Sequence, residues 1–410
     1  MKLPWGPGLS KQGARESLGR AWRAVSRDPA VRSAAPAFAL SRAIVLVLLV
    51  AAAHLTSGQP GPDRIHNSYL SLHGEPVWRK TREALLTADT NWYLGIAQEG
   101  YARGPFALDR PRNWAFFPLY PLLLRAAAPL FGNIVDAGLV LSHLFFFLAL
   151  VLLHKTAATF GLDEAARHRA VFYLALSPVS YFFSLPLPES LFLMLTLGSF
   201  YAARRERWAA AGLLGALASA TRMTGVLLVP VLLLLYWQQR RGRRLTADVL
   251  YVFLAPAGLF AFMLYLHRLT GNALAFKDAQ AASGWDRRPS LWWWQPLFEY
   301  LRKPGELIAS WNFSALNFCA AVLALACGVA WLRRREYALG AYTLLAVIIA
   351  LSSGLLQSHG RYVSVIFPVF IWLGALGQRR AVDETIRAVF AALLGLMTAL
   401  FAAHFAFVMS

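Results

Sequence analysis

Apolar residues along this chain gather into long runs separated by short polar junctions. A run of about 20 apolar residues can cross the hydrocarbon core of a bilayer as a helix, and a helix in lipid satisfies its own backbone groups. The pattern predicts an all-α polytopic membrane protein with one domain over residues 36–410. We expect about 11 transmembrane helices, at about residues 36–56, 134–154, 168–186, 189–203, 208–222, 223–238, 248–269, 313–332, 337–356, 362–377 and 387–408.

Basic junctions between these runs predict the orientation. Lys and Arg are favoured on the cytoplasmic side of a membrane, and all four strongly basic junctions fall on that side if the N-terminus is cytoplasmic. We therefore expect residues 1–35 to be a cytoplasmic basic segment of an integral plasma (inner) membrane protein. The junctions are RRER at 204–207, RRGRR at 240–244, RRR at 333–335 and RR at 379–380.

Composition supports this class and excludes others. The 410 residues are 58% hydrophobic and 15% charged, with a mean hydropathy of +0.47, whereas a soluble domain carries about 25% charged residues. The net charge of +19 lies in short runs between apolar segments, so we expect membrane lipids and no nucleic acid as partners. Cys319 and Cys327 are eight residues apart, about 12 Å along a helix, which is too far for a disulfide.

Two long segments fall outside the cytoplasm in this topology. In the first, residues 57–133, the stretch 77–101 has Trp and Leu at helical spacing and predicts an interfacial helix. The apolar stretch that begins at Phe116 is interpreted as interfacial or re-entrant, because a span there would move a basic junction outside. The second segment, 270–312, is rich in tryptophan: Trp285, Trp292, Trp293, Trp294 and Trp311. It is either an interfacial aromatic belt or a platform for a sugar or a lipid-linked substrate.

Asp89 is the first candidate for chemistry, because it lies in the first outer segment at the start of a predicted helix. A carboxylate there can take the proton of an acceptor hydroxyl as a new bond forms. Alternatively, its side chain caps the helix beginning at Thr90.

Four other ionisable residues fall on the same side of the membrane. Glu189 either starts a helix after Pro188 or serves a site, since an ionisable group in an apolar core is costly. Arg222 either complements a helix end, binds a lipid phosphate or pairs with Glu189. His359 and Arg361 stand at a helix N-terminus that suits a phosphate, or they form an ordinary capped end.

Asp109, Asp278 and Asp286 are reserve carboxylates on that side. Arg110 and Arg112 flank Asp109, which favours a surface ion pair, and the choice between Asp89 and Asp109 stays open. The chain has no Gly-rich P-loop, no HExxH and no carboxylate cluster at metal-site spacing. We expect no cofactor and no metal, because one carboxylate holds a divalent ion poorly.

Four blocks of sequence resemble the PIG-V type mannosyltransferases of the GT-C glycosyltransferases, in the same order. The blocks are DTNWYLGIAQEGY from Asp89, FFPLYPL from Phe116, PESLF from Pro188 and TRMTG from Thr221, with a looser match from Arg361-Tyr362 to Phe367-Pro368. The family commonly has Trp before the aspartate, where this chain has Ala88. The C-terminal half matches poorly, and acceptor choice is expected to reside there.

The resemblance implies a GT-C-like helical bundle with its active site at the extracytoplasmic membrane surface. It implies transfer of mannose from a polyprenyl-phosphate donor to a glycolipid or other envelope acceptor. Asp89 would be the base, Arg222, His359 and Arg361 would hold the phosphate, and Glu189 would orient an arginine or a sugar hydroxyl. Trp92, Tyr93 and Tyr362 are further candidates for substrate contact.

Two other functions are compatible with the sequence. A transporter or flippase of polyprenyl-linked sugars would need polar residues at the bilayer midplane, whereas the charges here lie at one end of the spans. A non-catalytic scaffold in envelope assembly would tolerate the loss of Asp89. The sequence identifies neither the acceptor nor a protein partner.

Overall fold

The computed structural model describes residues 26–55, 76–87, 89–240, 246–282, 289–303 and 315–403, together with residues 242, 244, 285 and 287. All regular elements within these residues are helical, which confirms the predicted all-α class. Most of the predicted basic segment 1–35, together with Ala88, Asp286 and Trp311, lies outside the described residues.

The elements of the first half are α2 (Pro29–Leu55), α3 (Pro76–Leu85), α4 (Thr90–Glu99), η1 (Asn113–Ala115), α5 (Leu119–Phe131), α6 (Ile134–Thr159), α7 (Glu164–Ala175), η2 (Ser180–Ser184), α8 (Glu189–Arg204) and α9 (Trp208–Ser219). Those of the second half are η3 (Met223–Leu227), α10 (Leu228–Gln239), η4 (Ala247–Leu254), α11 (Ala257–Thr270), α12 (Ala275–Asp278), η5 (Ala279–Ala281), α13 (Gln295–Arg302), α15 (Leu316–Arg333), α16 (Tyr337–Leu351), α17 (His359–Ser364), α18 (Pro368–Leu376) and α19 (Arg380–Ala402).

Long apolar helices make this an integral membrane protein. Among the described residues, α2, α6, α15 and α19 are each long and apolar enough to span a membrane, and the bent pair η4–α11 would be a fifth. The other predicted spans contain shorter or interrupted helices. The expected span 362–377, for example, is broken between α17 and α18. Helix length therefore identifies fewer spans than the eleven that hydropathy predicts.

The predicted interfacial helix over 77–101 is wrong as a single element, because α3 and α4 are separate helices. At the break, the Thr87 hydroxyl donates to the carbonyl of Ala84 and the Thr90 hydroxyl donates to the carbonyl of Thr87. Such local side-chain bonds compete with the backbone bonds of a continuous helix. The break creates the turn that carries Asp89.

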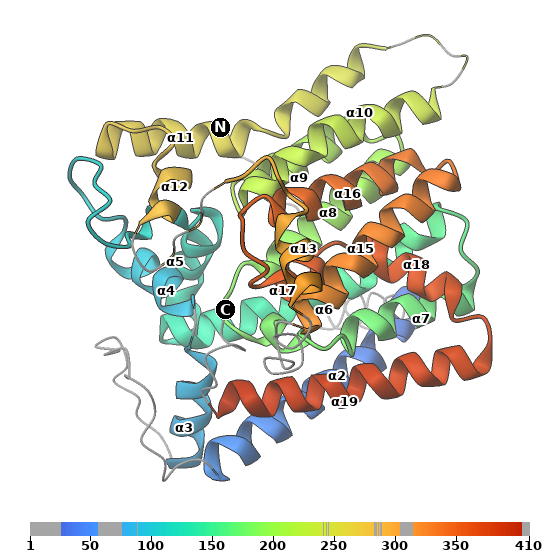
Figure 1. Cartoon of the computed structure of the whole chain (residues 1–410), viewed down its shortest axis with the longest axis horizontal. Coiled ribbons are helices and arrows are strands. Elements are labelled where there is room, and N and C mark those ends of the chain that lie inside the picture. The colour runs from blue at the N-terminus through green and yellow to red at the C-terminus, as the bar shows by residue number, and fades with distance from the viewer. Residues whose placement is uncertain are drawn as a thin grey trace, which may run out of the picture.

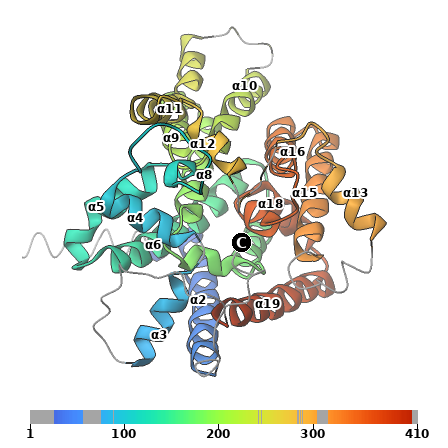
Figure 2. The same ribbon diagram turned by 60° about the vertical axis from the view of Figure 1, so that its left-hand side comes forward.

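The helices form two flanks around a central group. Helices α4 and α5 lie on one flank, α15, α16 and α18 lie on the other, and α6 and α8 run between them (Figure 1, and from another side in Figure 2). Along one edge, α2 packs beside α19 and α3. One large buried cluster joins most of these helices, and a smaller one around Trp114 and Phe262 lies under α11.

Glycines allow α9 to approach η4 and α11 closely. A Cβ at Gly212 would lie 1.9 Å from the carbonyl oxygen of Tyr251, and one at Gly258 would lie 2.1 Å from that of Ala216. Because backbone atoms cannot yield, any larger residue at these positions would force the helices apart. This packing matters for the site because α9 ends at Ser219, shortly before Arg222.

Candidate active site

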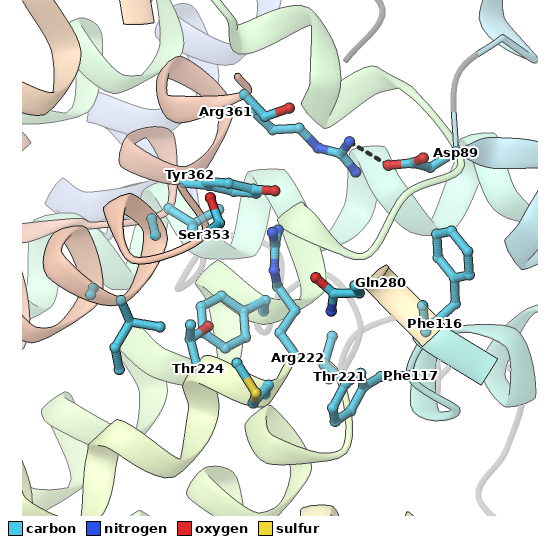
Figure 3. A pocket seen from close by; sticks show the side chains of 18 of the residues that line it. Asp89, Phe116, Phe117, Thr221, Arg222, Thr224, Gln280, Ser353, Arg361 and Tyr362 are labelled. Carbon is cyan, nitrogen blue, oxygen red and sulfur yellow. Dashed lines mark hydrogen bonds and ion pairs between the residues drawn. The ribbon is translucent and has the colours of Figure 1, made fainter. Parts of the chain in front are cut away.

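Four charged side chains from four segments form one continuous network. Arg361 donates from Nη1 to Oδ2 of Asp89 and from Nε to Oε1 of Glu189, at 2.6 Å in both cases. Arg222 donates from Nη1 to the same oxygen of Glu189 at 2.8 Å. Figure 3 shows Asp89 and Arg361 facing each other, with Arg222 directed toward them from the opposite wall. The pairing of Arg222 with Glu189 was one of the sequence-based alternatives, and it is present.

Burial makes this network costly to disturb. The Glu189 side chain is fully buried and that of Arg361 is 6% exposed, whereas that of Asp89 is 40% exposed. Glu189 holds two guanidinium groups that would otherwise repel each other, while its second oxygen, Oε2, has no hydrogen-bond partner among the described residues. Charges in such surroundings need partners. The four side chains therefore form a preorganised charged site, and Asp89 is its most solvent-exposed member.

A cavity of about 380 Å³ opens beside the network. Its polar wall includes Asp89, Arg222, Arg361 and Tyr362, and its apolar wall includes Phe116, Phe192 and residues of α16 (Figure 3). On α16 the lining residues are Tyr342, Ala346, Ile349 and Ala350, which recur at helical spacing and define one face, and Ser353 follows just after the helix. The cavity thus offers charged groups and an apolar groove to the same ligand.

Asp89 occupies the N-cap position of α4, but its side chain makes no capping hydrogen bond. The interpretation of Asp89 as a helix cap through its side chain is therefore wrong. Its carboxylate instead faces Arg361 and lines the cavity. Tyr93, one turn further along α4, is buried and also lines the cavity.

The TRMTG block positions Arg222 through its glycine. A Cβ at Gly225 would lie 2.4 Å from the backbone nitrogen of Ser219 and 2.5 Å from the carbonyl carbon of Ala218. Only glycine lets η3 fold this closely onto the end of α9. The amide of Gly225 also donates to the carbonyl of Arg222 at 2.9 Å, so this tight turn fixes the backbone from which Arg222 extends.

A buried arginine in α2 supports the opposite side of the network. Arg42 donates to the carbonyl of Ser180 at 3.0 Å and to the hydroxyl of Ser184 at 2.6 Å, at the two ends of η2. The ring of Phe182 in η2 lies 5.0 Å from the guanidinium of Arg361, a cation–π distance. Arg42 thus has a structural role, because it holds η2, whose Phe182 packs against Arg361.

Four predicted site residues lie outside the cavity lining, and one of them, Glu189, is the buried partner of the two lining arginines. His359 is fully buried and its Nε2 has no hydrogen-bond partner among the described residues. Trp92 stacks on Phe116 with ring centroids 5.4 Å apart, behind the lining. Asp109 is exposed and pairs with Arg112 at 3.1 Å, which lowers the pKa of Asp109 below its usual value. Of the two open carboxylates, the structure places Asp89 at the cavity.

Sequence reasoning missed Arg287, which lines the cavity from the Trp-rich segment. Trp285 lines it as well, and its ring lies 5.7 Å from Trp92 and 5.8 Å from Phe116. By contrast, Trp292 and Trp294 are exposed. The sequence did contain a signal, because Arg287 follows Trp285 by two residues in the predicted outer segment 270–312.

The described residues contain no group of three His, Cys, Asp or Glu side chains that could hold a metal ion. Cys319 and Cys327 are both free, as expected.

The fold and the site define an all-helical integral membrane protein with a charged cavity between its two flanks. The chain belongs to the family Mannosyltransferase (PIG-V), which matches residues 38–255. Asp89, Glu189 and Arg222 fall within the matched region, while Arg287 and Arg361 lie beyond it. Family membership places the protein among the glycosyltransferases.

Known relatives match parts of the chain. GPI alpha-1,6-mannosyltransferase 2 from Cricetulus griseus is 32% identical over 166 residues, and the match spans 37% of this chain and 32% of that protein. The oligosaccharyltransferase of Archaeoglobus fulgidus, solved with a tethered acceptor peptide, is similar with a TM-score of 0.44 and 13% identity, over 88% of this chain and 55% of that one. Its complex with an inhibitory peptide and a dolichol-phosphate gives 0.42 and 14%, over the same shares.

Proposed function

We propose that the protein is an inverting mannosyltransferase that uses a polyprenyl-phosphate-mannose donor. It would transfer mannose to a hydroxyl of a glycolipid or other envelope acceptor at the extracytoplasmic face of the membrane. The observation that carries the proposal is an accessible carboxylate, Asp89, at a cavity that also presents guanidinium groups and an apolar helix face. A lipid-linked sugar phosphate combines the anionic and apolar chemistry that this cavity accommodates.

In this reaction the carboxylate of Asp89 and the guanidinium groups of the network have separate roles. The acceptor oxygen attacks the anomeric carbon, and its proton passes to the carboxylate of Asp89. The bond from the anomeric carbon to the phosphate oxygen breaks, and its electron pair stays on the lipid phosphate. Arg222 and Arg361 stabilise that growing negative charge, and Glu189 holds both of them in place. His359 packs at 5.9 Å from the ring of Tyr362, so its contribution would be to position a residue of the lining.

The test is sugar transfer from radiolabelled polyprenyl-phosphate mannose in membranes that contain equal amounts of wild type or Asp89→Asn. Asparagine keeps the size of the side chain but cannot take the proton, so we expect transfer to fall by roughly 10²–10⁴-fold. Asp109→Asn is the matched control, because it also removes an arginine-paired carboxylate from the same outer segment, and it should retain activity.

Each result has a defined meaning. Equal transfer by wild type and Asp89→Asn would remove Asp89 from the mechanism and favour the scaffold among the alternatives. A loss in Asp109→Asn alone would move the base to the surface loop. No transfer by wild type would point to another donor sugar or to the transport of polyprenyl-linked sugars.

A further inference from the structure

Arg287 differs from the other cations of the cavity because no carboxylate of the described residues pairs with it. Its Nη1 donates to the hydroxyl of Tyr362 at 2.6 Å, and its guanidinium carbon lies 6.0 Å from the centroid of that ring. In the part of the chain that the structure describes, Arg287 makes no ion pair. Arg222 and Arg361, by contrast, each bind Glu189.

The charges around the cavity are therefore unequal. Two carboxylates, Asp89 and Glu189, face two guanidinium groups, Arg222 and Arg361, and these four side chains neutralise one another. Arg287 adds one positive charge beyond this balance among the described residues. A cation that lines a cavity without an anionic partner favours an anionic ligand.

Contacts on both sides of the cavity hold Arg287 in place. Its backbone amide donates to the carbonyl of Gln280 at 3.0 Å, and the amide of Ser290 donates to the carbonyl of Ser352, at the end of α16, at 2.7 Å. On the other side, Trp285 packs against Trp92 of α4. The Tyr362 ring, whose hydroxyl holds Arg287, also lies 5.4 Å from the guanidinium of Arg222. Arg287 is thus pre-oriented toward the paired arginines.

We propose that Arg287 binds the phosphate of the lipid-linked donor. This inference rests on the proposed function and assigns within it the cavity guanidinium that no carboxylate of the described residues neutralises. The donor is a phosphodiester with a single negative charge, which matches the single positive charge that the described residues of the cavity leave unpaired. When the bond between the anomeric carbon and the phosphate oxygen breaks, the released monoester gains negative charge, and the fork of an arginine can bind two of its oxygens.

The test measures binding directly, with purified protein in nanodiscs and a fluorescent polyprenyl phosphate as the probe. Losing one charge-assisted hydrogen bond weakens binding by about tenfold or more, so we expect Arg287→Gln to bind the probe at least that much more weakly than wild type. Arg287→Lys keeps the charge without the fork and should give an intermediate loss. Arg302→Gln is the control, because Arg302 lies over Phe298 in α13, away from the cavity lining.

Competitors identify which part of the probe is recognised. Unlabelled polyprenyl phosphate should displace the probe from wild type, whereas polyprenol and inorganic phosphate should not. In transfer assays, Arg287→Gln should raise KM for the donor and leave KM for the acceptor unchanged.

Three results would overturn the inference, and they differ in what else they reject. Equal binding by wild type, Arg287→Gln and Arg287→Lys would reject Arg287 as the phosphate ligand while leaving the proposed donor intact. Failure of wild type to bind the probe would reject the proposed donor together with this inference. Displacement by inorganic phosphate at the same concentration as the lipid would show a general anion site and reject a lipid-specific one.

Discussion

Replacing Glu189 with glutamine should destabilise the protein more than any other single change in the network. The substitution keeps the size of the side chain but removes the negative charge between Arg222 and Arg361. The Glu189 side chain is fully buried, and those of Arg222 and Arg361 are 19% and 6% exposed, so water screens the three groups little. Only Asp89 would then remain to balance two guanidinium groups.

The size of the effect follows from this burial. Removing one partner of a buried ion pair costs about 3–5 kcal/mol, because a buried charge is left without compensation. We therefore expect the free energy of unfolding of Glu189→Gln in mild detergent to fall by that amount. Glu384→Gln is the control: its side chain is 62% exposed and pairs with the exposed Arg380, so its effect should stay below about 1 kcal/mol.

A double mutant separates charge imbalance from other causes. Adding Arg222→Gln to Glu189→Gln removes one positive charge and leaves Arg361 paired with Asp89. Stability should then return by more than half, while sugar transfer stays low because the phosphate site has lost Arg222. The reasoning is refuted if Glu189→Gln unfolds like wild type, or if the double mutant is no more stable than Glu189→Gln.

Two further predictions concern backbone geometry and metal. Gly225→Ala should lower both stability and transfer, because its Cβ would clash with the backbone of Ser219 and displace Arg222. Gly95→Ala in α4 is the control, since its Cβ meets nothing within 4 Å and the variant should behave as wild type. Thermal unfolding and transfer assays on both variants check this, and an unaffected Gly225→Ala would contradict the role given to that turn. Dialysis against EDTA should leave transfer unchanged, since the proposed reaction uses only side chains of the protein. Activity that is lost in EDTA and restored by a divalent cation would contradict metal independence.

The sequence predicts much of the fold, because apolar runs determine where helices form. Each expected span contains at least one helix of the structure. The failures come from local chemistry that hydropathy does not record. The hydroxyls of Thr87 and Thr90 break the predicted interfacial helix, and the span over 362–377 divides before Pro368, which cannot donate a helix hydrogen bond.

For the site, the sequence predicts that Asp89, Glu189, Arg222 and Arg361 meet on one side of the membrane, and the structure joins them in one network. The sequence could not predict which atoms pair, because Arg361 lies 272 residues from Asp89 and 172 from Glu189 along the chain. The direction in which a side chain leaves its helix is set by tertiary packing. For the same reason the sequence could not show that His359, two residues from Arg361, is absent from the cavity lining or that Arg287 is part of it.

The different exposures of Asp89 and Glu189 let one experiment separate chemistry from folding. Asp89 is 40% exposed, and Arg361 keeps Glu189 when Asp89 is changed. Losing its ion pair should therefore cost less than losing the fully buried Glu189, and Asp89→Asn should remain folded under the conditions of the transfer assay. A loss of transfer by roughly 10²–10⁴-fold could not then arise from unfolded protein. Glu189→Gln should lose both stability and transfer. The Asp89 variant therefore tests proton transfer, and the Glu189 variant tests how the arginines that face the phosphate are held.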